Sequence, residues 1–141
     1  MPITWTISCF WDDGYLVMVN DQEENTRPMT VSQALDLVLS AATRRLRSST
    51  PDTRDILFDE IKPIEHALTA LVPLQALYDS EINFEVGWNE ERRFSWRLGD
   101  EMNGFKAHGE APDAEAVRDA LFAAAMQHFP KSEFALAPRA A

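Results

Sequence analysis

Residues 84–98, FEVGWNEERRFSWRL, restrict the fold most, because large apolar and polar residues alternate there on both sides of a charged segment. A period of two places successive side chains on opposite faces of a strand, so the stretch predicts an antiparallel hairpin with one buried face. Only one register buries both apolar sets, because a slip of one residue would turn one set to the solvent. Residues 89–93 then form the hairpin loop. The predicted register comprises the pairs Trp88–Phe94, Val86–Trp96 and Phe84–Leu98, with Glu85 opposite Arg97 on the outer face.

Three more strands are predicted, two before residues 84–98 and one after them. Residues 3–11 alternate, and their apolar face is predicted to carry Ile3, Trp5, Ile7, Cys9 and Trp11. A turn at Asp12-Asp13-Gly14 leads into residues 15–19, which are apolar on both faces, as in a central strand. After residues 84–98, a turn at 99–104 precedes a strand at 105–108, which completes a three-stranded meander.

Helical periodicity predicts three helices. The first covers residues 31–47, with Thr30 as N-cap and Gln33 completing a capping box. The second begins at Pro51 after Thr50 as cap, and its apolar stripe keeps its phase through Pro63. We therefore expect one long helix to about residue 78, kinked near Pro63 and again at Pro73, rather than two helices. The last helix covers residues 113–129 and ends at Pro130.

The predicted element order is ββ-αα-βββ-α, which is typical of an α+β fold. We expect one antiparallel sheet of about five strands with the helices packed on one face and the aromatic residues inside. A chain of 141 residues favours one domain, here residues 1–130. Residues 131–141 are expected to form a flexible C-terminal tail, although Phe134 and Leu136 could dock it.

The charge of the chain restricts its partners. It has 23 acidic and 13 basic residues, a formal net charge of −10. Such a surface repels phosphate backbones and anionic lipids, so we expect no direct nucleic-acid or membrane binding. A protein partner with a basic surface is compatible with this charge.

The cellular compartment is inferred first from the cysteine content. The single cysteine, Cys9, allows neither an internal disulfide nor a cysteine-based zinc site. The N-terminal residues lack a signal-peptide pattern, and no apolar run reaches the ~20 residues of a membrane span. These features together indicate a cytoplasmic protein.

Residues suited to catalysis or metal binding are few. His66 falls on the polar side of the second helix, His108 on the outer sheet face beside Ser95, and His128 near a helix C-terminus. None is accompanied by a complete catalytic or metal-ligating set, and no glycine-rich phosphate loop occurs. We expect no catalytic residues, metal or cofactor, and we expect Cys9 to be a buried, inert thiol.

Two charged surfaces are candidate binding sites. A possible anion-binding face lies on the outer side of the meander; its alternative is an exposed face neutralised by Glu85 and its neighbours. An acidic patch could occupy a basic groove on a partner, although solubility explains such charge equally well. The anion-binding face comprises Arg93, Arg97, Lys106 and His108. The acidic patch comprises Asp12, Asp13, Asp21, Glu23, Glu24, Asp52, Asp55 and Asp59.

Three function classes follow. The favoured one is a non-catalytic acidic protein-binding module, such as an inhibitor, an immunity or anti-defence protein, or an accessory subunit that docks on a larger, basic partner. The alternative is a small-molecule-binding domain whose pocket lies between the aromatic sheet face and the helix kinked at Pro63 or Pro73; a discrete apolar cavity is then expected. The third is a small enzyme that uses His108 or His66.

Overall fold

Six strands form one antiparallel sheet in the order β3-β2-β1-β4-β5-β6. The computed structural model describes residues 3–49 and 54–136, without the side chains of residues 48–49 and 54–60. Pairing of β1 with β4 joins the N-terminal strands to the meander. The strands are β1 (Trp5–Phe10), β2 (Gly14–Val19), β3 (Gln22–Glu23), β4 (Phe84–Trp88), β5 (Phe94–Asp100) and β6 (Gly104–Ala111).

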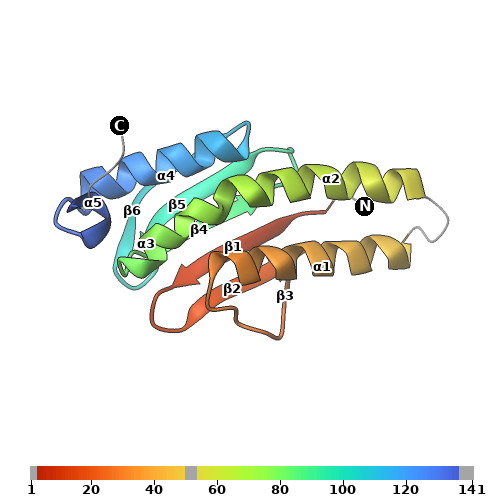
Figure 1. Cartoon of the computed structure of the whole chain (residues 1–141), viewed down its shortest axis with the longest axis horizontal. Coiled ribbons are helices and arrows are strands. Elements are labelled where there is room, and N and C mark those ends of the chain that lie inside the picture. Colours follow the sequence, from red (N-terminus) through yellow and green to blue (C-terminus); the bar gives the residue numbers. More distant parts are fainter. Residues whose placement is uncertain (1–2, 50–53, 137–141) are drawn as a thin grey trace.

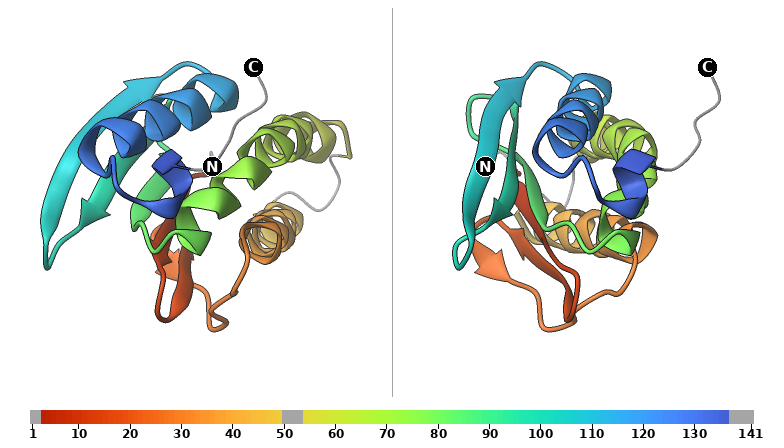
Figure 2. Two further views of the ribbon diagram at one scale, coloured as in Figure 1. Left: turned by 60° about the vertical axis from the view of Figure 1, so that its left-hand side comes forward. Right: turned by 90° about the vertical axis from the view of Figure 1, so that its left-hand side faces the viewer.

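The helices cover one face of this sheet and leave the other face without a helix (Figures 1 and 2). They are α1 (Val31–Ser49), α2 (Arg54–Leu71), the 3-10 helix η1 (Val72–Leu74), α3 (Gln75–Asp79), α4 (Ala114–His128) and α5 (Glu133–Leu136). In Figure 1, α2 runs between α1 and α4. The α+β prediction is confirmed, with six strands in place of about five. The additional strand is the two-residue β3, which lies in the polar segment after β2 and pairs with β2.

The hairpin register predicted for residues 84–98 is correct in all its pairs. Asn89 donates its backbone N–H to the Arg93 carbonyl at 3.0 Å, which closes the loop. The turn before β2 is also as expected, because Gly14 adopts a left-handed φ of 94° that a side chain would disfavour. Residue patterns within each segment therefore specify the β4–β5 hairpin and the β1–β2 hairpin.

The start of α1 has the predicted cap. The Gln33 backbone N–H donates to Thr30 Oγ1 at 3.1 Å, and the Gln33 side-chain oxygen accepts from the Met29 backbone N–H at 2.9 Å. In a standard capping box the side chain at the third helical position accepts from the backbone N–H of the N-cap residue, here Thr30. In this helix the Gln33 side chain accepts instead from Met29, one residue earlier. The first bond satisfies a backbone donor that the first helical turn leaves without a partner, and the second fixes the residue before the cap.

The second helix passes through Pro63 without a break, as its apolar phase predicts. The chain departs from an α-helix only at Pro73, where η1 separates α2 from α3. The predicted cap at Thr50 and the first position at Pro51 lie outside the described residues. Among the residues that are described, no helix is long and apolar enough to cross a membrane.

The core lies between the sheet and the helices, and Ile3, Trp5, Ile7 and Cys9 face it as expected. Trp11 was wrongly assigned to this face; its exposed fraction is 43% because β1 ends at Phe10 and the chain turns there. Near the C-terminus, Phe134 of α5 is buried and its ring lies 5.1 Å from that of Phe122, whereas Leu136 is exposed.

Candidate ligand-binding site

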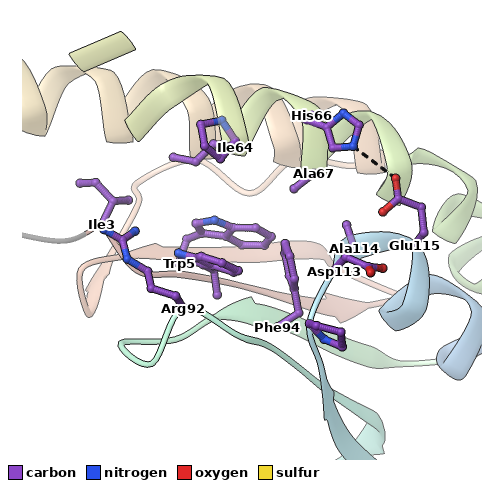
Figure 3. A pocket seen from close by; sticks show the side chains of 13 residues that line it. Ile3, Trp5, Ile64, His66, Ala67, Arg92, Phe94, Asp113, Ala114 and Glu115 are labelled. Carbon is purple, nitrogen blue, oxygen red and sulfur yellow. Dashed lines mark ion pairs between the residues drawn. The ribbon is translucent and has the colours of Figure 1, made fainter. Parts of the chain in front are cut away.

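A pocket of about 460 Å³ lies between α2, the start of α4 and the sheet (Figure 3). This volume falls in the range of roughly 300–1,000 Å³ that is typical of small-molecule sites. Apolar side chains predominate in the lining, and the charged ones lie at its ends. The lining residues are Ile3, Trp5, Pro63, Ile64, His66, Ala67, Trp88, Arg92, Phe94, Pro112, Asp113, Ala114 and Glu115.

The sheet side of the pocket is an aromatic wall, formed by Trp5, Trp88 and Phe94. These residues come from β1, β4 and β5 and lie directly opposite one another across the three strands. The Trp88 and Phe94 ring centroids are 4.7 Å apart, and the Trp5 ring meets Phe94 edge to face at 6.1 Å. Because the rings pack against each other, they form one continuous surface rather than separate anchors.

Helix α2 supplies the opposite wall through Pro63, Ile64 and Ala67. Their spacing of three and four residues places them on one side of the helix. Figure 3 shows Ile64 and Ala67 above Trp5 and Phe94, with the space between them. Residue 67 is alanine, and its single methyl group leaves space on the pocket side of α2 that a larger side chain would fill.

Charged residues lie at the two ends of the pocket. At one end, His66 of α2 approaches Glu115 of α4, with Nε2 3.4 Å from Oε1. Asp113 caps α4 at the same end, where its Oδ1 accepts the Ala116 backbone N–H at 2.8 Å. Arg92 and Ile3 lie at the other end (Figure 3). The site thus combines an apolar middle with carboxylates at one end and a guanidinium at the other.

This arrangement is suited to binding an apolar group by removing it from water, with the charged ends fixing its orientation. Within residues 3–49 and 54–136, no group of three or more histidine, cysteine or acidic side chains is placed to hold a metal ion.

The predicted acidic patch is divided in the structure. Asp12 and Asp13 lie in the β1–β2 turn, at the end of the molecule away from the start of α2 (Figure 1). Asp21 and Glu23 are exposed, but Glu24 is buried with an exposed fraction of 8%. Asp52 and the side chains of Asp55 and Asp59 lie outside the described residues.

Two of these acids pair with arginines of the same chain. Glu24 Oε1 lies 2.9 Å from Arg44 Nη2, and Glu24 Oε2 lies 2.9 Å from Arg45 Nη2. Asp13 forms an ion pair with Arg27. Glu24 therefore ties the segment after β3 to helix α1 instead of contributing to an exposed negative surface.

The four residues of the predicted anion-binding face do lie together on the outer side of β5 and β6 and in the loop before β5. Arg97 pairs with Glu85 at 2.7 Å, and its guanidinium lies 4.1 Å from the centroid of the Phe105 ring. Arg93 Nε is 3.7 Å from Glu110 Oε1. These carboxylates offset the positive charge, as in the alternative interpretation of this face.

The remaining candidates occupy separate environments. His108 is exposed on β6 opposite Arg97, whereas Ser95 lies opposite Glu110, so the two do not form a facing pair. His128 is exposed in the last turn of α4.

Cys9 is buried, and its Sγ donates to the Ile82 carbonyl at 3.7 Å. Burial raises the pKa of the Cys9 thiol from 9.0 to about 12, despite the hydrogen bonding at this sulfur. Opposite it in the hairpin, Tyr15 is fully buried, and its hydroxyl has no hydrogen-bond partner among the described residues. Burial, reinforced by Cys9, also raises the pKa of Tyr15. These groups belong to the core and not to the pocket.

The alternative small-molecule interpretation of the sequence placed a cavity between the aromatic sheet face and the helix kinked at Pro63 or Pro73, but it did not name Trp5, Trp88 and Phe94 as the lining residues. It did not identify Arg92, Asp113 or Glu115 as lining residues. The hairpin register already placed Trp88 beside Phe94, and the position of Trp5 required the β1–β4 pairing, for which no local pattern exists. Comparison with known protein families, curated proteins and solved structures finds no match to this chain.

Proposed function

We propose that this protein binds a small, largely apolar molecule in the pocket between the aromatic wall and α2. The observation that carries the proposal is the open volume of about 460 Å³ between Trp5, Trp88 and Phe94 on one side and the Pro63 region of α2 on the other. Protein interiors are normally packed to the density of organic crystals, with few voids larger than a water molecule. A space of this size beside a continuous aromatic surface is the usual form of a ligand site.

The arrangement of the wall also supports binding rather than a packing fault. Trp5 and Phe94 have exposed fractions of 2% and 5%, so the rings are held in place by the surrounding fold. A preorganised wall lowers the entropy that is lost when a ligand is immobilised. The charged residues at both ends give the site a polarity that an accidental void in a core lacks.

A substitution that fills the pocket tests this proposal. N-phenyl-1-naphthylamine, a neutral apolar fluorophore, should bind the native protein saturably and gain fluorescence. Ala67→Leu adds three carbons inside the pocket and should weaken this binding at least tenfold. Ala123→Leu makes the same change at an exposed position of α4 and serves as the matched control. Absence of saturable binding, or equal affinity in the two variants, would contradict the proposal.

A second candidate is the acidic docking module expected from the charge of the chain. A shallow hollow on the sheet face without helices is lined by Asp21, Glu90 and Glu91, which the fold brings together from two hairpins. A basic partner in the cytoplasm, the compartment that a free Cys9 favours, could occupy it. The test is co-purification of one basic protein at low salt that is lost in an Asp21→Lys, Glu90→Lys, Glu91→Lys variant and in high salt.

A further inference from the structure

We infer that the ligand of the pocket is a hydrophobic amine, with its ring on the aromatic wall and its ammonium group at the Asp113–Glu115 end. This inference rests on the proposed function and specifies the chemical class of the ligand. Two features of the described residues support it: the charge of that end and the aromatic surface leading to it.

The end of the pocket at α4 carries two carboxylates. The Glu115 side chain has an exposed fraction of 43%, and Asp113 is exposed. A helix N-terminus carries about half a positive charge, which on its own would attract an anion. Asp113 and Glu115 together outweigh it, so this end of the site is negative and suits a cation.

His66 contacts the same carboxylate that the ammonium group would use. The imidazole is 79% exposed, and its Nε2 lies 3.4 Å from Glu115 Oε1, longer than a good charge-assisted hydrogen bond. An ammonium group brings three donors to a shorter distance and can take the place of this contact. Glu115 is therefore accessible to a cationic ligand.

The aromatic wall favours the same class of molecule. Aromatic ring faces carry the negative side of the ring quadrupole, so the wall suits a cationic ligand better than an anionic one. The wall also provides a flat apolar surface for a ring or chain. With a net charge of −10, the protein raises the concentration of cations near its surface.

Arg92 lies at the end of the pocket away from Glu115 (Figure 3). It comes from the β4–β5 loop, where its backbone has a left-handed φ of 59°. With its ammonium group at the α4 end, the apolar part of such a ligand spans the middle of the pocket toward Arg92.

Three probes of similar size separate charge from apolar contact: 2-(2-naphthyl)ethylamine, 2-(2-naphthyl)ethanol and 2-naphthylacetate. In calorimetric titrations at pH 7, the amine should bind at least tenfold more tightly than the alcohol, and the carboxylate should bind most weakly. Glu115→Gln should reduce the advantage of the amine over the alcohol to threefold or less.

Asp113→Asn tests the second carboxylate and retains the cap of α4, because asparagine is as good an N-cap as aspartate. It should lower the affinity for the amine severalfold relative to that for the alcohol. Glu101→Gln removes a carboxylate from the exposed β5–β6 turn and should change nothing. Circular dichroism melts establish that each variant is folded before the titration.

The outcomes separate the two proposals. If the alcohol binds as tightly as the amine, or if the carboxylate binds more tightly, the amine inference is wrong. The pocket proposal survives that result when Ala67→Leu weakens all three probes. If none of the probes binds, both proposals fail. An unchanged preference for the amine in both Glu115→Gln and Asp113→Asn would also overturn the inference.

Discussion

Trp88 and Phe94 lie directly opposite each other across the β4–β5 hairpin, with their ring centroids 4.7 Å apart. Phe94 also receives the edge of Trp5 from the next strand but one. It is thus the ring that contacts both tryptophans, and it joins the hairpin to the N-terminal half of the sheet. The same residue supports the core and forms part of the aromatic wall of the pocket.

Phe94→Ala should therefore destabilise the protein by about 3–5 kcal/mol, the usual cost of truncating a buried phenylalanine. Urea unfolding followed by tryptophan fluorescence and circular dichroism measures this loss. Met102→Ala is the control, because Met102 is 96% exposed in the β5–β6 turn and should change stability by less than ~0.5 kcal/mol. Similar stabilities of the two variants would disprove the central position of Phe94.

Glu24 should stabilise the fold although it belongs to an acidic segment. Glu24→Gln removes the charge that holds Arg44 and Arg45, and we expect a loss of about 1–3 kcal/mol. Glu23→Gln makes the same change at the exposed neighbouring position and should stay within about 0.5 kcal/mol of the native protein. Chemical unfolding of both variants in the same buffer provides the comparison; equal losses would mean that the ion pairs contribute nothing specific.

The buried thiol predicts a specific dependence of stability on alkaline pH. Since the pKa of Cys9 is raised from 9.0 to about 12, the folded protein holds this proton more tightly than the unfolded chain does. Its contribution to the free energy of unfolding is complete below pH 9 and declines between pH 9 and 12, by up to about 1.4 kcal/mol per pH unit. Tyr15, whose pKa is also raised, adds to the decline.

Unfolding free energies at pH 8, 10 and 11 test this dependence. The variant Cys9→Val, Tyr15→Phe should show a shallower decline than the native protein. A decline of equal slope in both proteins would show that other groups account for it.

Glu85 and Arg97 allow a direct measurement of one cross-strand ion pair. They face each other in the predicted register at 2.7 Å, with side-chain exposures of 25% and 42%. A double-mutant cycle with Glu85→Gln and Arg97→Gln should give a coupling of about 0.5–1 kcal/mol, which decreases in 1 M salt. A coupling that is unaffected by salt would indicate that the contribution comes from packing rather than from charge.

The elements that sequence predicted well are those specified by local chemistry. The alternation around residues 89–93, the glycine at position 14 and the cap at Thr30 each act within a few residues, and each fixes its hairpin or helix start. The path of α2 through Pro63 followed from an unbroken apolar stripe. The strand β3 was not predicted because two exposed residues, Gln22 and Glu23, carry no periodic signal.

The site was harder to predict because it depends on contacts between distant segments. Trp5 joins the wall only through the pairing of β1 with β4, and Glu115 meets His66 only because α4 packs beside α2. The charge of a sequence segment was also a poor guide to which acidic side chains are exposed. Glu24 looks like a surface acid in sequence, yet the fold buries it between two arginines that lie twenty residues further on.

The pairing of β1 with β4 also has a consequence for biosynthesis. Ser8 on β1 donates to Glu85 on β4, 77 positions later, and both long helices lie between them in the chain. During translation the β1–β2 hairpin emerges from the ribosome well before β4, the other strand that pairs with β1, has been synthesised. The nascent chain must keep Trp5, Ile7 and Cys9 from aggregating until β4 is synthesised, so assembly of the sheet takes place late and nearly all at once.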